Sequence, residues 1–317
     1  MTPAQVKGLP AGKTRILDCT WFMPNSPRNA KEEFSKQHIA GAKYFDLDEV
    51  ASEHPLGLKH MMPSPEQFRD ACNSLGITRD HTVVLYDTLG IFSAPRALFT
   101  FKAFGHPSAF VLNGGLPAWR EELLPVEAAQ YDAGTEDLAS GDLADRGKDL
   151  PLSPMNNGVI RSFDDMLKNT LIGAKKADLV LDARPNARFT GTAPEPRPGL
   201  SSGHMEHSVS IPFSALLATH EGRLGPYTTL LSANELKQAM VNLLDSSGRN
   251  GEETLERILG GEQGVVASCG SGMTAAVIWL ALQELGANNI VPLFDESWTG
   301  WALRGRQGRV NYDIADS

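Results

Sequence analysis

The feature that most constrains the fold of this chain is an internal repeat. A short apolar segment that ends at Asp87 aligns with one that ends at Cys269, 182 positions later. The same offset aligns residues 112–119 with residues 294–301. Two copies of one structural unit explain these matches, so the chain is predicted to contain two domains of the same fold.

Each copy alternates short apolar runs with segments of helical periodicity. This alternation is typical of α/β domains in which a mainly parallel sheet carries helices on both faces. A chain of 317 residues is long enough for two such cores. We expect a first domain over residues 1–127 and a second over residues 158–317. Residues 128–157 are poor in large apolar side chains and are predicted to form a solvated linker.

The composition excludes several classes of protein. A net charge of -9 and an isoelectric point near 5.4 argue against nucleic acid as a direct partner. The three cysteines are widely separated, which gives no disulfide framework and no metal-ligand spacing, and we identify no cofactor motif. No apolar run approaches the roughly 20 residues of a membrane span. The basic N-terminal segment faintly resembles a transit peptide but is broken by proline and glycine, so we expect a cytoplasmic or mitochondrial protein.

Cys269 opens a glycine-rich loop between a predicted buried strand and a predicted helix that stops at Gly286. The loop reads Cys269-Gly270-Ser271-Gly272-Met273-Thr274. Its backbone N–H groups can form an anion-binding nest at the helix N-terminus, which favours a thiolate. A free cysteine is more often a small buried hydrophobe, but this arrangement is far less common, and we interpret Cys269 as a nucleophile. The first copy has Asp87 at this position and therefore has no nucleophile.

Cysteine-dependent phosphatases use a similar loop, but they place an arginine in it to bind phosphate. The corresponding position here is Ala275, and no basic residue lies between Cys269 and Gly286. A phosphate dianion would therefore meet amides without a countercharge. The sequence argues against a phosphatase.

The repeat, the Cys-Gly-Ser-Gly loop in the second copy and the segment RFTGTAPEPR at residues 188–197 resemble the two-domain rhodanese-type sulfurtransferases. Within that family the chain is most similar to the branch that uses 3-mercaptopyruvate. The resemblance implies that Cys269 takes a sulfur atom from the donor as a persulfide and releases pyruvate. The acceptor would be cyanide, a small thiol or a protein thiol such as thioredoxin.

Arg188 and Arg197 are the candidates for binding the carboxylate of the donor. The Cys269 loop carries no cation, and the planar guanidinium group suits a carboxylate. Two surface arginines in a polar loop are the commoner arrangement, and the family pattern decides for donor binding. The loop residues Gly270, Gly272, Met273 and Thr274 complete the predicted substrate site.

Ser271 is the candidate proton donor for the leaving enolate. The resemblance implies that it acts with a histidine and an aspartate of the first domain, and the matching positions are His60 and Asp48. A carboxylate that orients an imidazole is a sensible relay. Spacing alone does not select His60 over His38, and an ordinary loop histidine beside a turn-forming aspartate is the alternative.

The remaining cysteines and the repeated histidines are predicted to support the fold. Cys19 follows a predicted strand and Cys72 lies in a helical pattern, so both are expected to be buried. His38 and His204 occupy matching positions in the two copies.

Two alternatives remain open from the sequence. Thiosulfate is a possible donor, although the branch that uses it usually has basic residues where this chain has Gly270 and Ser271. The paired domains could also serve as a scaffold or a sulfur relay in a protein or tRNA thiolation pathway. The cysteine in the loop favours chemistry but does not exclude a protein acceptor.

Overall fold

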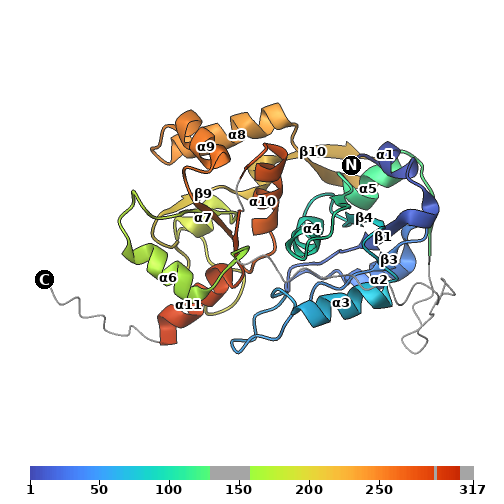
Figure 1. Cartoon of the computed structure of the whole chain (residues 1–317), viewed down its shortest axis with the longest axis horizontal. Helices are drawn as coiled ribbons and strands as arrows, with labels where there is room; N and C mark the ends of the chain where they lie inside the picture. The colour runs from blue at the N-terminus through green and yellow to red at the C-terminus, as the bar shows by residue number, and fades with distance from the viewer. Residues whose placement is uncertain (129–157, 289–290, 308–317) are drawn as a thin grey trace, which may run out of the picture.

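The structure is a computed structural model that describes residues 1–128, 158–288 and 291–307 (Figure 1). It contains two parallel β-sheets, each enclosed by helices. The predicted linker lies outside the described residues except for Ala128. No helix in the described ranges is long and apolar enough to cross a membrane.

The first sheet has four parallel strands. Their order is β3 (Lys43–Tyr44), β1 (Thr14–Asp18), β4 (Thr82–Tyr86) and β5 (Ala109–Val111). The helices around it are α2 (Ala30–Lys36), α3 (Pro65–Ser74), α4 (Ala94–Ala103) and α5 (Gly115–Glu121). Because side chains alternate along a strand, β4 sends Val83 and Leu85 into the core with α3 and α4, and Val84 and Tyr86 into the core with α5. Both faces of the sheet are therefore covered.

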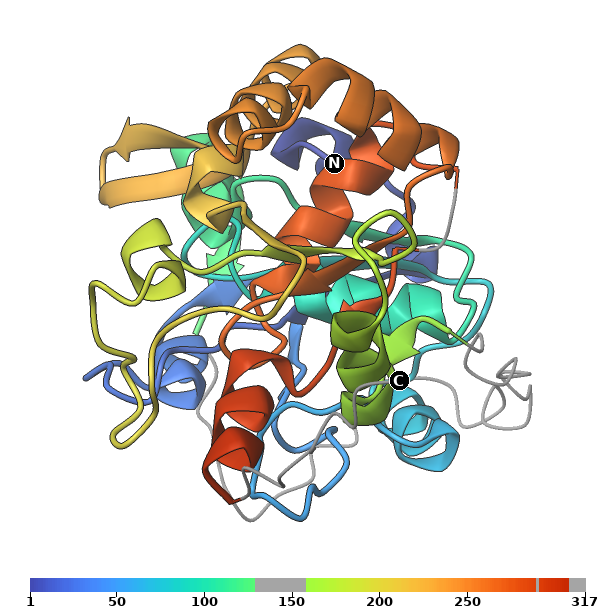
Figure 2. The same cartoon turned by 90° about the vertical axis from the view of Figure 1, so that its left-hand side faces the viewer.

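The second sheet has five parallel strands. Their order is β7 (Ile160–Arg161), β13 (Leu293–Phe294), β12 (Val265–Ser268), β8 (Leu179–Asp182) and β9 (Ser208–Ser210). Helices α8 (Ala233–Ser246), α9 (Gly251–Gly260) and α10 (Ala275–Glu284) pack on one face. Helices α6 (Phe163–Leu171) and α11 (Ser297–Gln307) pack on the other, as Figure 2 shows. The prediction of two α/β domains with parallel sheets and helices on both faces is confirmed.

Short elements complete the fold. They are α1 (Pro3–Lys7), a 3-10 turn at Ala11–Lys13, α7 (Asn186–Phe189), a 3-10 turn at Phe213–Leu216, a pair of strands β2 (His38–Ile39) and β6 (Val126–Glu127), and a hairpin of β10 (Leu217–Gly222) and β11 (Gly225–Leu230). The hairpin belongs to the second domain but contacts the first. The backbone N–H of Thr228 donates to the carbonyl oxygen of Leu89 at 3.2 Å, and Arg223 forms an ion pair with Glu121 at 3.2 Å.

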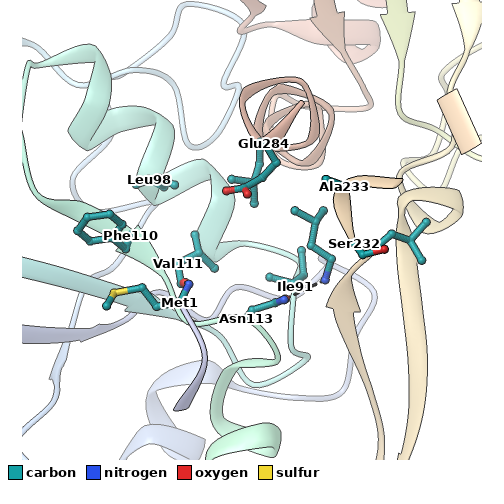
Figure 3. Close-up of a pocket in the computed structure, with 12 residues that line it drawn as sticks. Met1, Ile91, Leu98, Phe110, Val111, Asn113, Ser232, Ala233 and Glu284 are labelled. Carbon is teal, nitrogen blue, oxygen red and sulfur yellow. Dashed lines mark hydrogen bonds between the residues drawn. The ribbon is translucent and has the colours of Figure 1, made fainter. Parts of the chain in front are cut away.

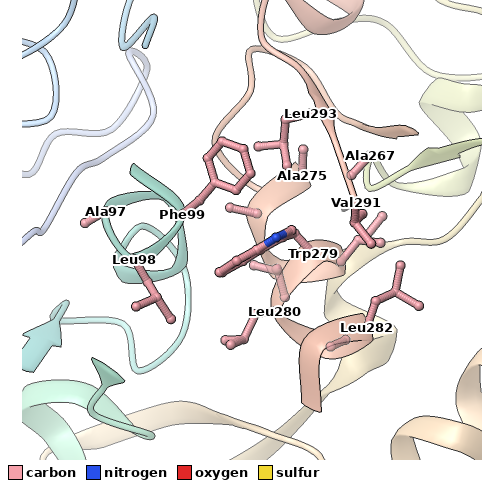
Figure 4. Close-up of a cluster of buried hydrophobic side chains, with 14 of the residues drawn as sticks. Ala97, Leu98, Phe99, Ala267, Ala275, Trp279, Leu280, Leu282, Val291 and Leu293 are labelled. Carbon is pink, nitrogen blue, oxygen red and sulfur yellow. The ribbon is translucent and has the colours of Figure 1, made fainter. Parts of the chain in front are cut away.

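Helices α4 and α10 join the two domains in one continuous apolar core (Figure 4). Both helices are buried on nearly all sides; α10 is apolar along most of its length, whereas α4 also buries the charged Arg96. The rings of Phe99 and Trp279 meet edge to face, with their centroids 5.3 Å apart. This packing places residues of the first domain beside the N-terminal end of α10, where Cys269 lies.

Candidate functional site

Cys269 follows strand β12 and accepts a hydrogen bond from its own loop. Its side chain is 2% exposed, and the backbone N–H of Gly272 donates to its Sγ at 3.1 Å. Gly272 has φ +82°, and a Cβ there would lie 2.6 Å from the carbonyl oxygen of Asp295. Glycine is therefore required at this turn, because other residues rarely adopt this backbone conformation and the space is filled. The loop holds a thiol against an amide donor at the entrance to α10.

Hydrogen bonds from the start of α11 fix the outer side of this loop. The backbone N–H of Trp298 donates to the carbonyl oxygen of Cys269 at 3.0 Å. The N–H and the hydroxyl of Thr299 both donate to the carbonyl oxygen of Gly270, at 2.9 and 2.5 Å. In a trans peptide the C=O and the N–H point in opposite directions. The N–H groups of Gly270 and Ser271 therefore face away from α11, as an anion-binding nest requires. Met273 is buried and Thr274 directly precedes α10, so every residue of the predicted nest lies in this turn.

Two guanidinium groups lie beside the loop at Gly270. A Cβ at Gly270 would be 3.1 Å from Nη2 of Arg188 and 3.8 Å from Nη1 of Arg197. The structure thus brings both predicted arginines to the Cys269 loop, although they precede it by more than seventy residues. The loop itself has no charged side chain, and these neighbours supply the positive charge.

Within the described residues, Glu195 forms an ion pair with Arg188 but not with Arg197. Its Oε2 accepts from Nε of Arg188 at 3.1 Å and also pairs with Nη2 of that residue. Its Oε1 accepts from Nη1 of the buried Arg184 at 2.7 Å, and Arg184 also pairs with Asp182 at 2.6 Å. Arg197 forms no ion pair with a carboxylate in the described ranges. Burial lowers the pKa of Arg197, opposed by the nearby charges of Cys269 and Glu195, but a guanidinium stays protonated, so this residue stays positively charged beside the loop.

His60 and Asp48 of the first domain form a hydrogen-bonded pair. Nδ1 of His60 lies 3.0 Å from Oδ1 of Asp48, whose Oδ2 accepts from Nε1 of Trp21 at 3.0 Å. Burial lowers the pKa of His60, so the imidazole is neutral near pH 7. Burial alone would raise the pKa of Asp48, but the hydrogen bonds from His60 and Trp21 outweigh it and lower the pKa. An ionised carboxylate only accepts, so Nδ1 carries the proton and Nε2 has the free lone pair.

Nε2 of His60 is buried and has no hydrogen-bond partner within the described residues. The ring is 1% exposed and packs edge to face on Trp21. Ser271 is 9% exposed, and no hydrogen bond joins it to His60 in the described part of the chain. The structure therefore joins two of the three predicted relay residues by a hydrogen bond.

Comparison with known proteins identifies the family. Residues 2–122 and 164–304 each match the rhodanese-like domain. The chain belongs to the rhodanese-like family. The family resemblance expected from the sequence is therefore confirmed, and the two matches correspond to the two sheets.

Relatives of this rhodanese-like protein match over most of its length. A protein of Schizosaccharomyces pombe named "Probable 3-mercaptopyruvate sulfurtransferase" is 33% identical over 297 residues, which cover 94% of this chain and 89% of the relative. "Thiosulfate/3-mercaptopyruvate sulfurtransferase 1, mitochondrial" of Arabidopsis thaliana is 37% identical over 297 residues, covering 92% and 72% of the two chains. The crystal structure of SseA from Escherichia coli, described as a 3-mercaptopyruvate sulfotransferase, superposes with a TM-score of 0.70 at 28% identity, covering 94% and 98%.

In the first rhodanese-like domain, the equivalent nest of backbone N–H groups is filled by the side chain of Asp87. Asp87 follows β4 as Cys269 follows β12. Its carboxylate accepts from five backbone N–H groups, those of Leu89, Gly90, Phe92, Ser93 and Ala94, at 2.9 to 3.0 Å. The carboxylate occupies the position that an anion would take, so this domain has neither a nucleophile nor a free nest.

The residues predicted to support the rhodanese-like fold are buried or stacked. Cys19 and Cys72 have no exposed surface, and burial raises the pKa of the Cys72 thiol to about 12. His38 stacks on Phe34, and His204 stacks on Phe189, in both cases with ring centroids 4.1 Å apart.

One cavity between the domains lies away from Cys269. A cavity of about 430 Å³ lies between the two domains and is lined by Leu98, Phe110, Leu230 and Glu284, among others (Figure 3). Glu284 ends α10, whereas Cys269 lies at its beginning, and a helix of this length spans about 15 Å. None of the predicted site residues lines this cavity.

Sequence reasoning missed three charged residues that organise the site: Arg96, Arg184 and Glu195. Glu195 lies within the quoted RFTGTAPEPR segment, so a motif signal was present, but its partners depend on the fold. Arg184 follows β8 directly, and the run Asp182-Ala183-Arg184 gave a weaker signal. No sequence pattern pointed to Arg96, which reaches the Cys269 loop from the other domain.

Proposed function

We propose that this chain is a 3-mercaptopyruvate sulfurtransferase. It moves a sulfur atom from 3-mercaptopyruvate through a persulfide on Cys269 to a thiol or cyanide acceptor and releases pyruvate. The observation that carries this proposal is the contact of the Gly272 amide with Sγ of Cys269, in a loop bordered by Arg188 and Arg197. Relatives that carry this name match at least nine-tenths of the chain.

The first half-reaction forms one bond and breaks one. The Cys269 thiolate attacks the donor sulfur, the S–S bond forms, and the donor C–S bond breaks with its electron pair leaving as the enolate of pyruvate. The proton of the donor thiol ends on the methyl group of pyruvate, and the persulfide stays as an anion. In the second half-reaction the acceptor attacks the outer sulfur, and the Cys269 thiolate leaves.

The nest and the two arginines bind different charged groups of the donor, the nest its sulfur and the arginines its carboxylate. Amides from Gly270 to Thr274 stabilise the anionic sulfur before and after transfer. The donor carboxylate lies several bonds from the reacting sulfur, within reach of Arg188 and Arg197 beside the loop. A charge held outside the nest fits this donor well.

His60 and Asp48 are proposed to serve proton transfer to the enolate, with Ser271 as the proposed proton donor. The free lone pair on Nε2 of His60 makes it an acceptor, and Asp48 fixes that tautomer. For the relay to operate, the Ser271 hydroxyl or the donor must supply the partner that Nε2 lacks within the described residues.

Thiosulfate is the second candidate donor, because the Arabidopsis relative carries both activities in its name. It is a dianion whose charge lies next to the transferred sulfur, so its charge must be neutralised at the loop itself. Glu195 offsets part of the positive charge there. We therefore rank thiosulfate below 3-mercaptopyruvate.

Three further assignments are proposals of the same kind. A protein thiol such as thioredoxin is the proposed physiological acceptor, in the cytoplasm or the mitochondrion. The proposed domains are residues 1–127, without a nucleophile, and residues 158–317, with the nucleophile, joined by the linker 128–157.

The test is the intact mass of the full chain after incubation with 3-mercaptopyruvate. We expect a gain of about one sulfur atom that a reducing thiol reverses, and no gain in Cys269→Ser. Cys19→Ser and Cys72→Ser are the matched controls and should keep the adduct, since both leave Cys269 and its loop unchanged. A persulfide retained in Cys269→Ser would overturn the assignment, and no adduct on the parent chain would favour a scaffold.

A further inference from the structure

Arg96 of the first domain reaches the Cys269 loop across the contact between α4 and α10. Its side chain is 2% exposed. Nη1 donates to the carbonyl oxygen of Gly272 at 3.0 Å, and Nη2 donates to the carbonyl oxygen of His60 at 2.8 Å. Nη2 also lies 2.6 Å from Oδ1 of Asp295. One guanidinium group therefore connects the nucleophile loop with the loop that carries His60.

The contact with Gly272 completes a set of hydrogen bonds that hold the loop from outside. Trp298 and Thr299 bind the carbonyls of Cys269 and Gly270 from the second domain. Arg96 binds the carbonyl of Gly272 from the first. Because C=O and N–H are opposed in a trans peptide, this bond turns the N–H of Met273 away from Arg96. Each bound carbonyl thus fixes the direction of the amide that follows it.

Asp295 keeps this buried cation compensated. It follows β13, pairs with Arg96, and accepts from the backbone N–H of Met62 through Oδ2 at 2.6 Å. A Cβ at Gly272 would lie 3.2 Å from Nη1 of Arg96 and 2.6 Å from the carbonyl oxygen of Asp295. The pair therefore packs directly against the turn whose amide contacts the sulfur.

We propose that Arg96 is a positioning residue for sulfur transfer: it aims the amides of the Cys269 loop, so that the first domain completes the nest of the second. Arg96 acts through Gly272 and Met273 and does not touch the sulfur. The role explains why a domain without a nucleophile is packed so closely on the one that has it. It rests on the proposed function for turnover, whereas its effect on the thiol is independent of the donor.

The experiment measures the alkylation rate of Cys269 by iodoacetamide in the full chain, across the pH range in which a thiol ionises. The modified peptide is quantified by mass, so Cys19 and Cys72 do not interfere. The variants are Arg96→Lys, Arg96→Met and the double variant Arg96→Met/Asp295→Asn, which removes both buried charges. Arg223→Met is the matched control, because it breaks an exposed contact between the domains away from the loop.

In Arg96→Met we expect alkylation near pH 7 to slow on the order of tenfold, with the half-maximal pH moved upward, because the loop amides lose their alignment. The double variant should regain thermal stability but not reactivity, which separates loop positioning from the cost of an unpaired Asp295. Arg96→Lys should fall between, since one ammonium cannot reproduce the fork that spans two carbonyls. Arg223→Met should react like the parent.

A parental pH profile in Arg96→Met would overturn the proposal. If that variant does not fold, a parental profile in the double variant or in Arg96→Lys would overturn it equally. Failure of the proposed function would look different: the parent chain would not turn over 3-mercaptopyruvate, while the alkylation rates would still separate the variants.

Discussion

Asp87 and Cys269 directly follow the equivalent strands β4 and β12 of the two domains, and each side chain accepts hydrogen bonding from the loop that follows it. The Asp87 carboxylate accepts from five backbone N–H groups, whereas Sγ of Cys269 accepts from the N–H of Gly272. A carboxylate has two oxygens and a fixed charge, so it fills the nest by itself. A single sulfur leaves amides available for the transferred atom. Equivalent loops thus bind a carboxylate in the first domain and a thiol in the second.

Asp87→Ala should destabilise the protein with little change in turnover. The substitution leaves five amides of the first domain without their acceptor, so we expect a loss of about 3 kcal/mol or more in the free energy of unfolding. Urea unfolding measures this loss, and kcat/KM for 3-mercaptopyruvate should stay near the parental value. Asp70→Ala on the exposed side of α3 is the control and should be neutral. Equal stability of Asp87→Ala and the parent would contradict the structural role.

Arg197→Ala and Arg188→Ala should both raise KM for the donor but differ in stability. Each loses a charge-assisted contact with the carboxylate, so kcat/KM should fall on the order of tenfold to a hundredfold. Arg197 pairs with no carboxylate in the described ranges, and its loss should leave Tm nearly unchanged. Arg188→Ala strips one partner from the buried Glu195 and should lower Tm.

The double variant Arg188→Ala/Glu195→Gln separates these two effects. It neutralises the carboxylate that has lost one of its two arginine partners, so Tm should recover while KM for 3-mercaptopyruvate stays high. Parental donor kinetics in both single arginine variants would place the carboxylate site elsewhere.

Glu195→Gln should shift donor preference toward thiosulfate. The change preserves shape but removes one negative charge between Arg184 and Arg188, so the site becomes more favourable for a dianion. We expect the ratio of kcat/KM for thiosulfate to kcat/KM for 3-mercaptopyruvate to rise by about tenfold, equivalent to about 1.4 kcal/mol. Glu206→Gln, an exposed position of the second domain, is the control. An unchanged ratio would show that this charge does not select the donor.

His60 should make the protein less stable in mild acid. Burial lowers the pKa of His60 in the folded state, so the unfolded chain binds the proton more readily. Stability is then highest above the ordinary histidine value of about 6.5 and falls as the pH drops below it. The Tm of the parent should therefore fall relative to the Tm of His60→Gln as the pH is lowered from about 7.5 to about 5. Asp48 stays ionised over this range. A constant difference over this range would rule out a buried neutral imidazole.

The sequence by itself determined the features that depend on local pattern. The repeat predicted equivalent strands, and β4 and β12 indeed end at Tyr86 and Ser268, directly before Asp87 and Cys269. The apolar run, the glycines and the helical periodicity predicted a strand, a turn and a helix around Cys269. These signals are visible in a short window because alternation and helical period are properties of neighbouring residues.

The tertiary structure decided how the two domains complete one site. Arg96 and Gly272 are 176 positions apart, and Met62 and Asp295 are 233 apart, yet each pair is hydrogen-bonded. Their meeting depends on how α4 packs against α10, and apolar packing is not directional, so no local pattern encodes the contact. The sequence could propose Cys269 as the nucleophile, but the position of Arg96 behind its loop follows from the docking of two whole domains.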